Sequence, residues 1–153
     1  MSKKFREYNG LNLTAVADEI LAFWEKEQIF EKSISTRDAQ KPYVFFEGPP
    51  SANGLPGIHH VMSRTIKDII CRYKTLQGYQ VKRKAGWDTH GLPIELGVEQ
   101  ELGITKEDIG KKISIEEYNE ACKKTVMRYT DVWNDLTRHV GYWVDMDDPY
   151  VTY

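Results

Sequence analysis

The sequence predicts an α/β fold built on one βαβ unit with parallel strands, preceded by a helix and followed by a long helix. Two runs rich in aromatic and β-branched residues, "PYVFFE" at 42–47 and "YQVKRKA" at 79–85, are typical of short strands. Between them lies a stripe of apolar residues at helical spacing. A strand, a helix and a strand with tight joins require parallel strands.

The first predicted helix runs from its cap, Asn12, to about residue 28, and its apolar residues, Trp24 among them, recur at helical spacing. The polar segment 31–41 is expected to be a loop before the strand at 42–47. The central helix carries the strongest apolar stripe of the chain, which includes Ile58, Val61, Met62, Ile66, Ile69, Ile70, Tyr73 and Leu76. Gly78 ends this helix.

After the second strand, glycine and proline mark the segment 86–93 as a loop, and a short helix is expected over 94–103. Ser114 and Glu117 form a capping box that begins one long amphipathic helix over 115–140. The tail 142–153 is predicted to be extended or irregular. The chain is divided into a helical extension, 1–42, and an incomplete domain, 43–153, because two parallel strands do not make a complete sheet.

Composition and charge exclude several classes of protein. The hydrophobic fraction of 41% indicates a globular chain, and no apolar run is long enough to span a membrane. The two cysteines, Cys71 and Cys122, lie within helical patterns and outside any metal-ligand spacing, which favours a reduced, cytoplasmic protein without a structural metal. The net charge is −2, but the segment 59–84 holds seven basic residues and one acid. This segment indicates either a phosphate-bearing ligand or a solvated helix face.

The stretch "EGPPSANGLPGIHH", residues 47–60, joins the first strand to the central helix. Pro56 suits a helix start, and the amides from Gly57 onward carry partial positive charge that can bind phosphate. At helical spacing His60 shares a face with Arg64, which predicts a polyphosphate site with the imidazole as a hydrogen-bond donor. The alternative is a tight strand-to-helix connection with surface histidines.

The loop "GWDTHGLP" after the second strand contributes Asp88 and His90. Loops that follow parallel strands leave the same edge of the sheet, so both loops are expected to face one crevice. The carboxylate of Asp88 could there hold a substrate ammonium group. A local turn cap is the alternative. Trp24 and Trp133 lie on apolar stripes and are predicted to be core residues.

The segments "FFEGPPSANGLPGIHH" and "IKDIICRYKTLQGYQVKRKAGWDTHGLPIE" resemble the N-terminal catalytic region of class I aminoacyl-tRNA synthetases, and within that class the isoleucyl family. The resemblance runs from about Phe5 to Tyr153. It implies a partial Rossmann-like nucleotide-binding fold, and it implies that isoleucine, ATP with Mg²⁺, and tRNA(Ile) are the partners of a full-length enzyme, monomeric and not bound to a membrane. It further implies that Pro49 and Asp88 hold the amino acid, with Asp88 pairing to the ammonium group.

The segment Gly57-Ile58-His59-His60 matches the family's "HIGH" motif, which implies contacts with ATP. Helical spacing adds Arg64 to the predicted ATP-binding residues. Only His60 falls on a motif histidine. Gly57 stands at the position of the other, and His59 stands where the family usually has glycine. We therefore expect His60 to be catalytic and hypothesise that His59 replaces the missing imidazole.

The family's "KMSKS" loop, its remaining strands, its editing insertion and its anticodon-binding domain do not occur within these 153 residues. The expectation is that the chain acts as the N-terminal catalytic portion of an isoleucine–tRNA ligase and alone is inactive or very weak. Two alternatives stay open: a truncated module that binds ATP, an adenylate or a tRNA end, and a relative that transfers nucleotidyl groups to another acceptor.

Overall fold

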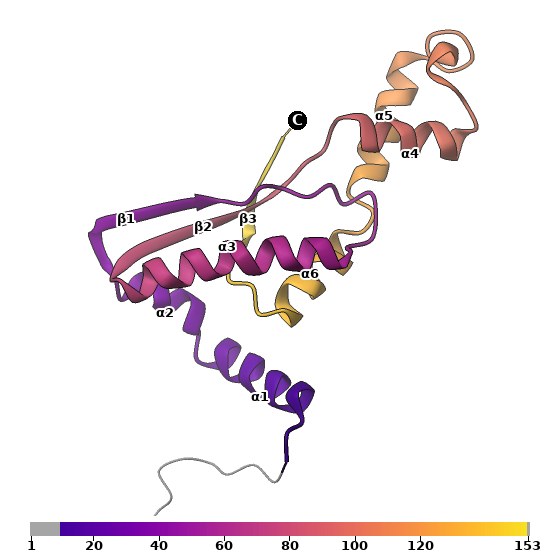
Figure 1. The fold of residues 1–153 in the computed structure, drawn as a ribbon. Helices are drawn as coiled ribbons and strands as arrows, with labels where there is room; N and C mark the ends of the chain where they lie inside the picture. The colour runs from indigo at the N-terminus through magenta and orange to yellow at the C-terminus, as the bar shows by residue number, and fades with distance from the viewer. Residues whose placement is uncertain (1–9, 153) are drawn as a thin grey trace, which may run out of the picture.

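Three parallel strands and six α-helices make up the computed structural model, which describes residues 10–152 (Figure 1). The first nine residues of the predicted extension and Tyr153 lie outside the described residues. The strands, in sheet order, are β1 (Asp38–Phe46), β2 (Tyr79–Trp87) and β3 (Asp145–Val151). The helices are α1 (Leu13–Lys26), α2 (Ile29–Ser35), α3 (Ile58–Leu76), α4 (Leu92–Leu102), α5 (Ile115–Val126) and α6 (Thr130–His139), with a short 3₁₀ turn, η1 (Lys106–Asp108), between α4 and α5.

The predicted βαβ unit is confirmed. β1 and β2 pair in parallel, with Tyr43 opposite Val81 and Phe46 opposite Lys84, and α3 connects them. Val81 is fully buried, as expected for the central strand of the sheet.

The C-terminal tail adds a third parallel strand that the sequence did not assign to the sheet. β3 pairs with β2, placing Val151 opposite Trp87. Its sequence, "DMDDPYV", is acidic and contains a proline, which local propensity disfavours in a strand. Within the described residues β3 lies at the edge of the sheet, where a proline without an amide hydrogen is tolerated.

The prediction of a loop over 31–41 is wrong, because this segment contains most of α2 and the start of β1. Gln28 adopts a left-handed conformation, with φ of 50°, and separates α2 from α1. The side chain of Gln80 in β2 donates a hydrogen bond to the carbonyl of Ile34, at 3.3 Å. Such tertiary contacts stabilise a helix of two turns that would be marginal alone.

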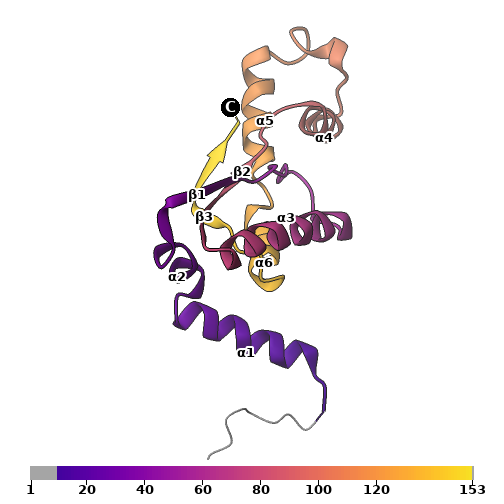
Figure 2. The ribbon, with the colours of Figure 1, turned by 60° about the vertical axis from the view of Figure 1, so that its left-hand side comes forward.

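The long helix predicted over 115–140 is broken into α5 and α6. At the break, the amide of Tyr129 donates to the carbonyl of Ala52, at 2.9 Å, instead of continuing the helical ladder. Ala52 belongs to the loop after β1, so a contact distant in sequence sets the break. α5 pairs with α4 away from the sheet, while α6 lies near α3 (Figures 1 and 2).

α3 forms as predicted, but its apolar stripe faces solvent in this chain. Ile58, Ile66 and Ile69 are 75%, 59% and 61% exposed. The buried residues of the helix are instead Arg64, Cys71 and Thr75. The periodic pattern therefore predicted the helix correctly without identifying the face that packs on the described part of the molecule.

Part of the core lies where the loop after β1 and the end of β2 meet α6. Ala52, Trp87 and Trp133 form one buried cluster, and Ala85, Tyr142 and Val144 form another. Trp133 is a core residue, as predicted. Trp24 is only partly buried, and α1 has no buried residue, so α1 contributes little to the core.

Gly86 of β2 provides a test of the packing between β2 and β3. A Cβ at this position would lie 2.6 Å from the ring carbon Cζ of Tyr150, so Gly86→Ala forces the ring or the strand to move. We expect the substitution to lower the free energy of unfolding by about 1–3 kcal/mol. Urea unfolding followed by tryptophan fluorescence measures the change.

Gly54→Ala is the matched control, because a Cβ there meets no atom within 4 Å. Equal unfolding midpoints for the two alanine variants would contradict the described packing of Tyr150.

Candidate active site

The loop after β1, residues 47–57, is held by hydrogen bonds from α6 and the turn before it. The indole Nε1 of Trp133 donates to the carbonyl of Gly54, at 2.8 Å, and the amide of Tyr129 donates to that of Ala52. Ala52 is completely buried. These contacts fix the path of a loop that leads directly into the N-terminus of α3.

The loops after β1 and β2 lie side by side, as the sequence predicts. The amide of Asp88 donates to the carbonyl of Pro50, at 3.0 Å. The side chain of Asn53 donates to the carbonyl of Pro93, at 3.1 Å. Pro49, which precedes Pro50, is partly buried beside this junction. The structure thus places Asp88 against Pro50, the residue that follows Pro49.

The carboxylate of Asp88 is partly exposed, with 38% of its side chain accessible. Its Oδ1 accepts a hydrogen bond from the hydroxyl of Thr152, at 3.1 Å, and Nδ1 of His90 lies 3.7 Å from the same oxygen. The alternative of a local turn cap is not what the structure shows, because the partner of the carboxylate is 64 residues away in sequence. Asp88 therefore presents a negative charge at the mouth of the two loops.

α3 begins with an interaction between Gly57 and His60. The amide of Gly57 donates to Nδ1 of His60, at 2.9 Å. A neutral imidazole that accepts at Nδ1 carries its proton on Nε2, so Nε2–H is the donor that His60 can offer. The His60 ring also packs edge-on against Trp133, with ring centroids 4.7 Å apart. The ring is thus fixed in both tautomer and orientation.

His59 is exposed and lies against its neighbour. The two imidazole centroids are 3.8 Å apart. A Cβ at Gly57 would lie 2.9 Å from Cε1 of His59, so the His59 ring occupies the space beside the glycine. The two departures from the "HIGH" pattern are therefore structurally linked, since the glycine leaves room for the displaced imidazole. The described interactions include no direct contact between Asp88 and either histidine.

The structure also shows a buried carboxylate that sequence reasoning missed. Glu47 is 3% exposed and accepts hydrogen bonds from Lys67 of α3 and from the hydroxyl of Tyr142. Its amide donates to the carbonyl of Lys84, at 2.8 Å, and its carbonyl accepts from the hydroxyl of Tyr150. Burial and the bond to Glu47 raise the pKa of Tyr142, so its hydroxyl stays a donor. A lone glutamate at the end of an apolar strand was the available signal.

Arg64 shares a face of α3 with His60, as predicted, but this face packs on α6 instead of lying open. Arg64 is 6% exposed, donates to the hydroxyl of Thr137, and stacks 5.1 Å from the Trp133 ring centroid. Burial lowers its pKa, while nearby Glu47 opposes that effect. This packing does not favour the predicted role of Arg64 as an ATP ligand, which stays a prediction.

Most basic residues of the segment 59–84 bond to other groups of the protein, either in its interior or at its surface. Arg83 is buried and bonds to Thr75 and Asp68, and Arg72 bonds to Asp68, at 2.6 Å. Lys84 pairs with Asp148, at 2.7 Å. The number of basic residues in this segment therefore does not by itself indicate a phosphate-binding surface.

Residues 10–152 contain neither a cluster of metal ligands nor a membrane-spanning helix. No group of three or more His, Cys, Asp or Glu side chains in this part of the chain is placed to hold a metal ion. None of its helices is both long and apolar enough to cross a bilayer.

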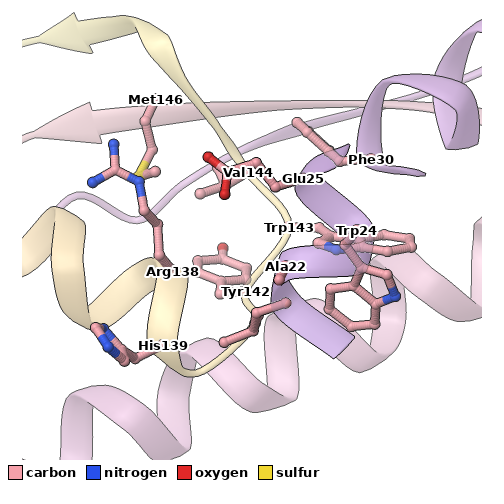
Figure 3. A pocket seen from close by; sticks show the side chains of 12 residues that line it. Ala22, Trp24, Glu25, Phe30, Arg138, His139, Tyr142, Trp143, Val144 and Met146 are labelled. Atoms are coloured by element: carbon pink, nitrogen blue, oxygen red, sulfur yellow. The ribbon is translucent and has the colours of Figure 1, made fainter. Parts of the chain in front are cut away.

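An open cavity of about 370 Å³ lies between α1, the end of α6 and the segment leading into β3 (Figure 3). Its wall is mostly apolar and includes Trp24, Phe30, Tyr142 and Trp143. None of the predicted site residues lines it, so this cavity is separate from the two loops.

The pKa of His60 gives a test of the site on the chain itself. Burial, the adjacent His59 and the positive Arg64 all lower this pKa below its ordinary value of 6.5, because they disfavour the imidazolium. We expect the Cε1 proton of His60 to titrate in NMR spectra with a midpoint below 6.5. Because the unfolded chain then binds more protons than the native chain, His60 lowers stability as the pH falls below 6.5.

The spectrum of His60→Gln assigns the resonance. A midpoint at or above 6.5 would contradict the neutral, Nδ1-accepting ring.

This chain is similar to known proteins both in sequence and in fold. A family model described as tRNA synthetases class I (I, L, M and V) matches residues 19–153. Isoleucine–tRNA ligase of Bacteroides thetaiotaomicron is 65% identical over 153 residues, which are 100% of this chain and 13% of that protein. Isoleucine–tRNA ligase of Porphyromonas gingivalis is 63% identical over the same length, or 14% of that protein. The chain thus spans about one seventh of the length of these relatives.

A solved structure, LeuRS of Agrobacterium radiobacter K84 in a ternary complex with tRNA and LeuAMS, superposes with a TM-score of 0.58. It covers 89% of this chain and 15% of that one, at 20% identity, and so supports the Rossmann-like fold alone. The family model, in contrast, covers the sheet, α3 and both loops in one continuous match. The chain therefore belongs to the class I tRNA synthetases (I, L, M and V).

Proposed function

We propose that this chain is the N-terminal catalytic portion of an isoleucine–tRNA ligase. The reaction joins isoleucine to ATP as isoleucyl-adenylate with release of pyrophosphate, and then transfers the isoleucyl group to tRNA(Ile). The observation that carries the proposal is the identity of 63–65% to two isoleucine–tRNA ligases along the whole chain, including both loops. The adjacency of these loops gives the amino acid and the nucleotide a common place to meet.

Asp88 and Pro49 form the amino-acid side of the proposed site. The carboxylate of Asp88 pairs with the ammonium group of isoleucine, and charge-assisted hydrogen bonds of this kind are the stronger ones. Pro49 lines the site from the neighbouring loop. This contact directs the isoleucine carboxylate toward the N-terminus of α3, where the nucleotide phosphates are proposed to lie.

The segment Gly57-Ile58-His59-His60 forms the ATP side. A carboxylate oxygen of isoleucine attacks the α-phosphorus of ATP, the bond from that phosphorus to the bridging oxygen breaks, and pyrophosphate leaves with the electron pair. Nε2–H of His60 donates to the negative charge that develops on the phosphate oxygens. The free amides of the first helical turn add partial positive charge at the same place.

His59 supplies the second imidazole in this proposal. Its ring lies beside Gly57, where the family's first motif histidine would begin, and it packs at a tilt against the His60 ring. Exposure leaves its ring nitrogens open to a ligand. The small side-chain volume at residue 57 is what permits this placement.

As part of the nucleotide substrate, Mg²⁺ would be held by the phosphates of ATP and would neutralise part of their charge. The predicted domain boundary at 42–43, the cytoplasmic location and the monomeric state of a full-length enzyme stay predictions. So does the expectation that the isolated chain is inactive or very weak.

Isoleucine-dependent pyrophosphate exchange by the full-length enzyme tests the two histidines. We expect His60→Ala to lower the exchange rate by about 100-fold or more, because it removes a donor to developing charge. His59→Ala should lower it by about tenfold. His139→Ala is the matched control, because this exposed histidine near the end of α6 bonds only within its own helix.

An unchanged rate in His59→Ala would remove the proposed compensation while leaving the ligase assignment intact. Absence of isoleucine-dependent exchange in the unaltered enzyme would instead overturn the proposed function and favour a binding module or another acceptor.

A further inference from the structure

Thr152 lies immediately after β3 and bonds to the loop that carries Asp88. Its amide donates to the carbonyl of Trp87, at 3.2 Å, which extends the pairing of β3 with β2 by one residue. Its hydroxyl donates to Oδ1 of Asp88, at 3.1 Å, and accepts from the amide of Thr89, at 3.2 Å. Three bonds from one residue thus reach three consecutive positions, Trp87 at the end of β2 and then Asp88 and Thr89 of the loop.

In these bonds the Thr152 hydroxyl acts both as a donor and as an acceptor. A threonine hydroxyl has one donor hydrogen, and here that hydrogen points to the carboxylate. Among the described residues, Oδ2 of Asp88 has no such donor, so this oxygen stays available to an incoming cation. The carboxylate is held at one oxygen by the protein and presented to solvent by the other.

The bond from Thr152 matters because Asp88 lies in a partly exposed loop. Its loop ends at Gly91, whose φ of 100° is a conformation that glycine adopts readily. The side chain is 38% exposed, and neighbouring His90, 69% exposed, lies 3.7 Å from it. Packing alone does not fix a carboxylate in such a place.

We propose that Thr152 is a positioning residue that orients the Asp88 carboxylate for the ammonium group of the amino-acid substrate, an inference that rests on the proposed function. The hydroxyl fixes the Asp88 rotamer, and the amide of Thr152 fixes the distance of the loop from β3. Thr152 acts through Asp88 and does not touch substrate. The sequence alone did not indicate this role, because 64 residues separate the two side chains.

If Thr152 positions Asp88, its loss weakens the binding of ligands that carry an ammonium group and leaves the binding of other ligands unchanged. Loss of a merely structural threonine would weaken the binding of all ligands alike. Thr152→Val keeps the size of the side chain but removes the donor and the acceptor, whereas Thr152→Ser keeps both. Thr36→Val is the matched control, because the Thr36 hydroxyl is exposed and bonds only locally, donating to the carbonyl of Lys32 and accepting from the guanidinium of Arg37. Thermal unfolding of each variant checks that the fold persists.

The experiment measures pyrophosphate exchange by the full-length enzyme with isoleucine and ATP varied separately. Two competitors report on the ammonium contact: isoleucinol, which keeps the ammonium and lacks the carboxylate, and 2-hydroxy-3-methylpentanoic acid, which lacks the ammonium. In Thr152→Val we expect the KM for isoleucine and the inhibition constant of isoleucinol each to rise about tenfold. The KM for ATP and the inhibition constant of the hydroxy acid should stay within about twofold, as should all values for Thr152→Ser.

Equal losses for all four ligands would show a structural role and overturn the proposal, as would unchanged constants in Thr152→Val. An Asp88→Asn variant distinguishes failure of the positioning role from failure of the proposed function. If Asp88→Asn weakens the binding of isoleucinol and Thr152→Val does not, Thr152 has no positioning role, while the proposed function stands. If the unaltered enzyme shows no isoleucine-dependent exchange, both fail.

Discussion

The buried carboxylate of Glu47 is the constraint on which the rest of the arrangement depends. A buried charge is costly unless it is paired and hydrogen-bonded, and Glu47 meets this condition with Lys67 and Tyr142. Its main chain bonds to β2 and to Tyr150 of β3. One residue at the end of β1 therefore connects the sheet, α3 and the C-terminal segment, and it directly precedes the loop that leads to the histidines.

This connection explains how a chain with a small core can position a site. α3 presents few apolar residues to the sheet, and its stripe of isoleucines is exposed. The helix is held instead by polar contacts, with Lys67 on Glu47 and Arg64 between Trp133 and Thr137. Because these contacts are directional, they set the place of the α3 N-terminus relative to the loop of Asp88 more closely than apolar burial alone would.

The sequence predicted those parts of the fold and the candidate site that depend on local pattern. Helical periodicity located α3, β-branched and aromatic runs located β1 and β2, and parallel pairing placed both loops at one edge. What it missed depends on contacts between distant residues: the break before α6 at Ala52, the pairing of β3, and the bonds of Glu47 and Asp88 to residues more than 60 positions away. The prediction that Arg64 lies on an open face is wrong for the same reason, since α6 covers this face of α3.

The central claim is that the loops after β1 and β2 form one site for an aminoacyl-adenylate. Amide NMR shifts of the chain, titrated with a non-hydrolysable isoleucyl-adenylate analogue, test this claim most directly. We expect the amides of residues 48–60 and of residues 86–91 to shift together and to fit a single dissociation constant. Shifts confined to one of the two segments, or fits with two distinct constants, would contradict it.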